Sequence, residues 1–149
     1  MYNTLLVHLD GSKRSEAILP HVEDLALRFG AKVIFLRIEV DVMMLGYDEV
    51  VDLSAYQQNR DRRKNDAGSY LAGLEGVLKE KNISAKRIVS FGSVVQSILD
   101  TAEREGADLI AMASHGRSSL SRVFYGSVAA GVLHRVDRPL LIIRSRGVE

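Results

Sequence analysis

A chain of 149 residues has the length of one domain, 1–149, and can bury roughly 70% of the surface that its unfolded form exposes. Its 20 basic and 19 acidic residues leave a net charge of +1, which excludes a general attraction to nucleic acid or to a membrane surface. It has no cysteine for disulfides or thiol catalysis and no apolar run suited to a signal peptide or a membrane span, so we expect a cytoplasmic protein.

The first part of the chain predicts a strand, a helix and a second strand. Residues 5–9 form a near-continuous apolar run, typical of a strand covered on both faces, and Asp10-Gly11-Ser12 ends it. Apolar residues then recur at helical spacing over 18–29, where Pro20 requires the regular helix to begin or bend nearby. A second strand of the same buried type is expected at 33–38.

The middle of the chain is more polar. An irregular segment is expected over 41–55, and the very polar stretch 57–66 precedes a helix with an apolar stripe over 67–78. The basic residues at 60–64 are typical of a solvated helix face. The strand expected at 85–91 carries two basic residues, which favours a position at an edge of the sheet.

The last part of the chain continues the alternation. A helix is expected over 95–102 and is closed by Gly106, a strand follows at 109–112, then a helix over 128–136 and a strand at 139–144. Strands that alternate with helices predict an α/β fold. We expect a Rossmann-like, doubly wound parallel sheet of five strands with helices on both faces.

A candidate phosphate-binding motif follows the strand at 109–112. Gly116 lies just past that strand, and after nine further residues the pair Gly126-Ser127 opens a helix. Glycine lets backbone amides approach an anion, and the first turn of a helix presents unpaired N–H groups to it. Ser127 would cap this helix or donate its hydroxyl to a phosphate, and Arg117 is near enough in sequence to add positive charge.

Asp10 is expected close to this motif. Ligands of doubly wound sheets bind beyond the carboxyl ends of the strands, where the strand order reverses. If the first and fourth strands are neighbours at that point, Asp10 and the loop after Met112 face the same crevice. Two simpler interpretations stay open: Asp10 closes its own turn through an Asx hydrogen bond, and the glycines serve a loop and a helix cap without any ligand.

The chain resembles the universal stress protein family along its whole length. The motifs that carry this resemblance are Asp10-Gly11-Ser12, the segments 105–110 and 138–143, Ser114-His115-Gly116-Arg117 and Gly126-Ser127. The resemblance implies a sheet with the strand order 3-2-1-4-5. It also implies a homodimer through the last strand, at Leu140–Ile143.

One branch of the family binds ATP through a motif of glycine, two residues, glycine, nine residues, glycine and serine or threonine. On this chain the motif falls on Ala113, Gly116, Gly126 and Ser127, so alanine replaces the first glycine. The resemblance implies ATP with Mg²⁺ as the cofactor, with Asp10 beside the ribose and adenine and the glycines around the phosphates. The expected nucleotide-binding residues are His8, Leu9, Asp10, Ile38, Met112, Ala113, Gly116, Arg117, Gly126, Ser127 and Val128.

The function expected from these features is that of a regulatory protein of the stress response, which uses ATP as a switch. The sequence contains no P-loop Gly-Lys-Ser/Thr and no Gly-x-Ser-x-Gly motif, and its histidines lack metal-ligand spacing. We therefore expect a binding protein rather than an enzyme, with at most slow ATP hydrolysis.

Three alternatives were weighed against this function. The first is a homodimeric interaction protein of the same family that uses no nucleotide, and the second is a protein that binds AMP or cyclic AMP. The third, a phosphorylated receiver domain, is disfavoured because Asp10 stands without a second acidic residue after the first strand.

Overall fold

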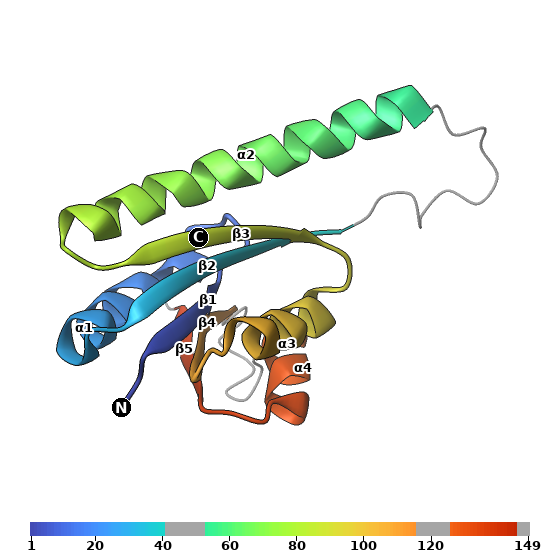
Figure 1. The fold of residues 1–149 in the computed structure, drawn as a ribbon. Coiled ribbons are helices and arrows are strands. Elements are labelled where there is room, and N and C mark those ends of the chain that lie inside the picture. The colour runs from blue at the N-terminus through green and yellow to red at the C-terminus, as the bar shows by residue number, and fades with distance from the viewer. Residues whose placement is uncertain (41–52, 116–125, 146–149) are drawn as a thin grey trace.

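A parallel β-sheet at the centre of the molecule sets the positions of the other elements (Figure 1). The computed structural model describes residues 1–40, 53–115 and 126–145. The strands are β1 Thr4–His8, β2 Lys32–Glu39, β3 Ala85–Phe91, β4 Leu109–His115 and β5 Leu140–Ser145. They form a five-stranded sheet in the order β3-β2-β1-β4-β5, and all neighbouring strands are parallel, which confirms the expected topology.

Helices cover both faces of this sheet, as the alternating pattern predicted (Figure 1). The first helix begins at Leu19 after a short 3-10 turn, with Pro20 in its first turn. N–H groups in the first turn make no hydrogen bond within the helix, so proline, which has no N–H, is tolerated there. The helices are η1 Ser15–Ile18, α1 Leu19–Phe29, α2 Leu53–Glu80, α3 Val94–Glu105 and α4 Ser127–Arg135.

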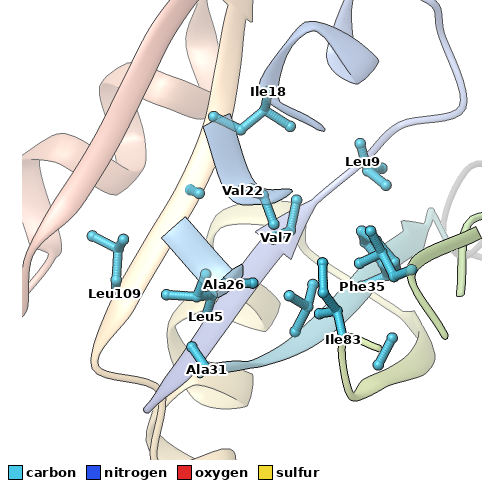
Figure 2. Close-up of a cluster of buried hydrophobic side chains, with 14 of the residues drawn as sticks. Leu5, Val7, Leu9, Ile18, Val22, Ala26, Ala31, Phe35, Ile83 and Leu109 are labelled. Atoms are coloured by element: carbon cyan, nitrogen blue, oxygen red, sulfur yellow. The ribbon is translucent and has the colours of Figure 1, made fainter. Parts of the chain in front are cut away.

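Two apolar clusters bury the two faces of the sheet. Side chains alternate along each strand, so Leu5 and Val7 join the cluster under α1 and α2, whereas Leu6 joins the one under α3 and α4. Figure 2 shows the first cluster, in which strand residues gather beside Ile18 and Val22. Burial of both faces of the sheet therefore explains why the strand sequences are almost continuously apolar.

The strand order reverses between β1 and β4. The chain proceeds from β1 to β2 and β3 on one side and continues with β4 and β5 on the other. β1 and β4 are paired in register through Leu5 with Leu109 and Val7 with Ala111. Their carboxyl ends are therefore adjacent at the switch point, the place where such sheets bind ligands.

The helix α2 is longer than expected. The irregular segment predicted over 41–55 is wrong for residues 53–55, which are helical, and 41–52 lie outside the described residues. The polar stretch 57–66 is also helical, within a helix of 28 residues. The helix buries side chains only from Ala67 onward, so its first half has no apolar stripe that the sequence could reveal. Residues of good helix propensity form this half.

Contacts from distant segments hold this polar half of α2. A guanidinium nitrogen of Arg63 donates to a carboxylate oxygen of Glu39 and to the carbonyl of Val40, both at 2.8 Å. The guanidinium of Arg60 lies 4.3 Å from the ring centre of Phe91. The expectation of a solvated basic face therefore holds for the exposed Arg60 but is wrong for Arg63, which is half-buried.

None of the helices in 1–40, 53–115 and 126–145 combines the length and the apolar character that crossing a bilayer requires.

Candidate functional site

A cleft of about 210 Å³ lies at the switch point, between the carboxyl ends of β1, β2 and β4 and the first turn of α4. Eight of the eleven expected site residues line it. Three other residues, Ser15, Val94 and Ala129, line it as well. The eight expected residues are His8, Asp10, Ile38, Met112, Ala113, Gly126, Ser127 and Val128.

Of the remaining three expected residues, one lies elsewhere and two fall outside the described residues. Leu9 is fully buried in the cluster on the opposite face of the sheet, because consecutive strand residues point to opposite faces and His8 points into the cleft. Gly116 and Arg117 lie outside the described residues. The structure therefore brings the two ends of the expected motif, Ala113 and Gly126-Ser127, to one cleft.

The wall made by the strands is largely apolar. Ile38 and Met112 come from β2 and β4 and belong to the cluster under α3 and α4, together with Val94 at the start of α3. His8 lies between them on β1 and is only 8% exposed. Such a surface suits the flat apolar face of a base better than a charged group.

The loop after β1 is held by its own hydrogen bonds. The N–H of Ser12 donates to Oδ1 of Asp10 at 2.8 Å, so the Asx turn proposed from the sequence is present. The N–H of Asp10 donates to Oγ of Ser15 at 3.3 Å, and that hydroxyl donates to the carbonyl of Ser12 at 2.8 Å. Asp10 thus closes its turn and also lines the cleft.

The first turn of α4 forms the opposite wall. Gly126 is the N-cap residue, with φ 80° and ψ 157°, a conformation that glycine adopts far more easily than other residues. The first intrahelical bond runs from the N–H of Ala130 to the carbonyl of Gly126 at 3.0 Å. The N–H groups of the residues between them have no acceptor within the helix, so they are suited to an anion in the cleft.

Ser127 does not cap α4. It is the first helical residue rather than the N-cap, and no side-chain hydrogen bond caps this helix. Its side chain is exposed and lines the cleft. Of the two roles considered for this hydroxyl, the geometry favours a contact with a bound group.

The charges around the cleft limit its chemistry. Among the described residues, no lysine or arginine lines it, and Asp10 supplies its one carboxylate. Within the same part of the chain, no group of three or more histidine, aspartate or glutamate side chains gathers around a possible metal position. Within the described residues, the groups suited to a bound anion are the backbone amides and the positive end of the helix dipole.

A model of the universal stress protein family matches residues 1–144. The chain belongs to this family. Universal stress protein MJ0577 of Methanocaldococcus jannaschii is 25% identical over 157 residues, which cover 98% of this chain and 97% of that protein. Universal stress protein YxiE of Bacillus subtilis is 28% identical over 155 residues, covering 97% of this chain and 100% of that protein.

Solved structures of universal stress proteins share the fold. The structure of MJ0577 has a TM-score of 0.83 at 23% identity and covers 99% of both chains. A universal stress protein solved in complex with cAMP has a TM-score of 0.60 at 22% identity, over 97% of this chain and 98% of that one. At this level of identity the likeness shows the fold alone.

Proposed function

We propose that this universal stress protein is a cytoplasmic regulatory protein that binds an adenine nucleotide, ATP in the first place, and changes its interactions in response. One observation carries the proposal. The cleft places an apolar wall, Ile38 and Met112, opposite the first turn of α4, with the Asp10 carboxylate beside them. An apolar slot, a carboxylate and a set of amides without an acceptor in their own helix match the base, the ribose and the phosphates of a nucleotide.

The residues would divide these tasks by their chemistry. Ile38 and Met112 would flank the base, and the Asp10 carboxylate would accept hydrogen bonds from ribose hydroxyls. The amides at the start of α4 and the Ser127 hydroxyl would donate to phosphate oxygens. No lysine lines the described cleft in the manner of a P-loop, so we propose that any hydrolysis is slow.

Mg²⁺ fits this arrangement as a companion of the nucleotide rather than as a resident ion. Mg²⁺ keeps several waters and binds through phosphates and one or two carboxylates. The described cleft offers one carboxylate, that of Asp10. The described cleft residues have no cationic side chain that could balance the charge of the phosphates. Bound Mg²⁺ would supply that positive charge.

Cyclic AMP or AMP is the second candidate. The cleft of about 210 Å³ is smaller than the roughly 300–1,000 Å³ usual for sites of drug-sized ligands, which favours a small nucleotide. The neighbour solved in complex with cAMP shows that a fold of this kind can hold that ligand. Both candidates use the same apolar wall and differ in the number of phosphate groups at α4.

Calorimetric titration with ATP, ADP, AMP and cAMP tests the proposal. We expect saturable binding that Ser127→Asp abolishes, because a carboxylate in the first turn of α4 repels phosphate while it favours the helix dipole. Ser93→Asp at the start of α3 is the matched control and should bind normally, since Ser93 is not among the residues that line the cleft. Absence of saturable binding at millimolar nucleotide would refute the proposal.

We also propose a homodimer through β5. This strand pairs with β4 alone in the described sheet, and Leu140–Ile143 are only half-buried within one chain. A second copy pairing along this edge would cover both the open backbone groups and the apolar side chains. Sedimentation at micromolar concentration checks this, and a purely monomeric chain would exclude it. A dimer without nucleotide binding would support the ligand-independent alternative.

A further inference from the structure

A larger hollow lies away from the cleft, between α2 and the edge strand β3. Two adjoining cavities of about 460 and 440 Å³ share Lys64 and Val89 in their walls, and each has about twice the volume of the cleft. We call this hollow the α2–β3 groove. Its defining residues are Arg60, Lys64, Gly68 and Ser69 on α2, with Arg87 and Val89 on β3.

Small residues on one side of α2 create the groove. The helix runs along β3 (Figure 1) and packs on the core through Ala67, Leu71 and Leu78. The side that faces the outer part of β3 carries Gly68, which has no side chain, and Ser69, whose side chain is too short to fill the space. The helix and the strand therefore pack closely on the side of the core, whereas a gap remains between them on the outer side.

Within the described part of the chain, no strand pairs with the outer edge of β3, which runs along the same groove. The N–H of Val33 donates to the carbonyl of Ser84 at 2.8 Å, and the N–H of Gly92 donates to the carbonyl of Glu39 at 3.0 Å. Alternate residues of a strand point their backbone groups to the same side, so the even-numbered residues of β3 face β2. The N–H and C=O groups of Arg87, Val89 and Phe91 consequently point outward, where another strand could pair with them.

The groove has a local excess of positive charge. Among the described residues, Arg60, Lys64 and Arg87 line it, against one acidic residue, Asp61, and Glu75 balances part of the charge of Arg87. Arg87 also pairs with the buried carboxylate of Glu75 at 2.7 Å, which fixes its position at the wall. The whole chain has a net charge of only +1, so this excess belongs to the groove rather than to a generally basic surface.

We propose that the α2–β3 groove docks an extended acidic segment of a partner protein, which adds to the sheet as a strand beside β3. The outward backbone groups of β3 supply the pairing, and every second side chain of the segment enters the groove, where carboxylates meet Lys64 and Arg87. A second copy of this chain is a poor occupant, because two β3 strands side by side would bring their basic residues together. The proposal does not depend on nucleotide binding.

The test uses end-capped heptapeptides in which glutamate alternates with valine, threonine or tyrosine, titrated into the ¹⁵N-labelled full chain. We expect saturable shifts of the amides of Arg87, Val89 and Phe91 and of the groove side of α2, with a dissociation constant of about 1 mM or below. The same peptides with lysine in place of glutamate should not bind, and neither should peptides N-methylated at alternate residues.

Two matched variants separate the groove from general electrostatics. Lys64→Glu should weaken the peptide by about five- to tenfold, because it reverses a charge in the wall of the groove. Arg62→Glu makes the same change in net charge at an exposed residue of α2 that is not among the groove residues, and should leave the affinity within about twofold. Circular dichroism of both variants should show unchanged helix content.

Four results with the peptides and variants would overturn the proposal, and so would one result without peptide. They are the absence of saturable shifts up to about 5 mM peptide, equal binding of the lysine peptides, equal weakening by the two variants, and equal binding of the N-methylated peptides. Concentration-dependent shifts of the β3 amides without peptide would also overturn it, since the occupant would then be a second copy.

Discussion

The hydroxyl of Tyr70 donates a hydrogen bond of 2.9 Å to a carboxylate oxygen of Glu16, and so ties α2 to η1. The guanidinium of Arg37 lies 5.4 Å from the centre of the same ring. It also packs against Gly11, in the loop that carries Asp10. A helix that does not line the cleft is therefore connected to a loop that does.

Tyr70 should make stability depend on pH in the alkaline range. Burial, followed by the hydrogen bond to Glu16 and the charge of that residue, raises the pKa of Tyr70 above its ordinary value. Because the folded state holds this proton more tightly, the contribution is complete below about pH 10 and is lost as the pH rises further. Urea unfolding between pH 8 and pH 11 should show a steeper loss of stability for the natural chain than for Tyr70→Phe. Parallel pH profiles would contradict this.

Glu75 should contribute to stability at neutral pH and lose that contribution in acid. Hydrogen bonds from Lys79 first and Arg87 second, each at 2.7 Å, lower the pKa of this buried carboxyl against the opposing effect of burial. The contribution of a depressed pKa is present above the unfolded value of about 4.3 and disappears as the pH falls through the folded value. Glu75→Gln should cost about 1 kcal/mol at pH 7, since both partners are half-exposed, and less at pH 3. An equal loss at both pH values would show that charge is not involved.

Gly131 permits the contact between α3 and α4. A Cβ atom at this position would lie 2.7 Å from Cγ2 of Val95. Gly131→Ala should therefore destabilise the chain by about 1–3 kcal/mol through overpacking, less the helix propensity gained. Gly73→Ala on α2 is the control, because no described atom beyond its own stretch of helix backbone lies within 4 Å of its Cβ position, and it should stabilise by up to about 1 kcal/mol. Thermal unfolding measures both, and Val95→Ala should restore part of the stability that Gly131→Ala removes.

Gly11 is favoured mainly by its backbone conformation and, to a smaller degree, by the space that the end of the Arg37 side chain leaves beside it. Its φ of +88° disfavours other residues, and a Cβ atom would lie 2.8 Å from Nη1 of Arg37. Gly11→Ala should cost about 1–3 kcal/mol in unfolding free energy. In an Arg37→Ala background the same change should cost less, since only the backbone strain remains. An identical cost in both backgrounds would assign the whole effect to the backbone.

The regular part of the fold could be predicted from the sequence because burial leaves a simple pattern. Strands covered on both faces give apolar runs, as at Leu5–Leu9, and helices over the core give stripes such as Val22 and Ala26. The polar half of α2 could not be predicted in this way. It covers no core, and Glu39 and Phe91, which hold it, come from distant strands.

The candidate site was predictable where it depends on a local motif. Asp10, Gly126 and Ser127 follow strands or open a helix, and parallel topology brings such positions together. Ser15 and Val94 reach the cleft only through the packing of η1 and α3, which no local pattern indicates. The position of Leu9 follows from strand alternation, which places it opposite to His8.

The strand order has a consequence for synthesis on the ribosome. β1, the central strand, precedes all others, so β1, β2 and β3 can pair once residue 91 has emerged, while the other edge of β1 waits for β4. The wall of the cleft that α4 provides emerges later still, after residue 126. A nascent chain therefore has a half-sheet with an open edge but no complete cleft, and a ligand of the cleft can stabilise only molecules whose translation has passed α4.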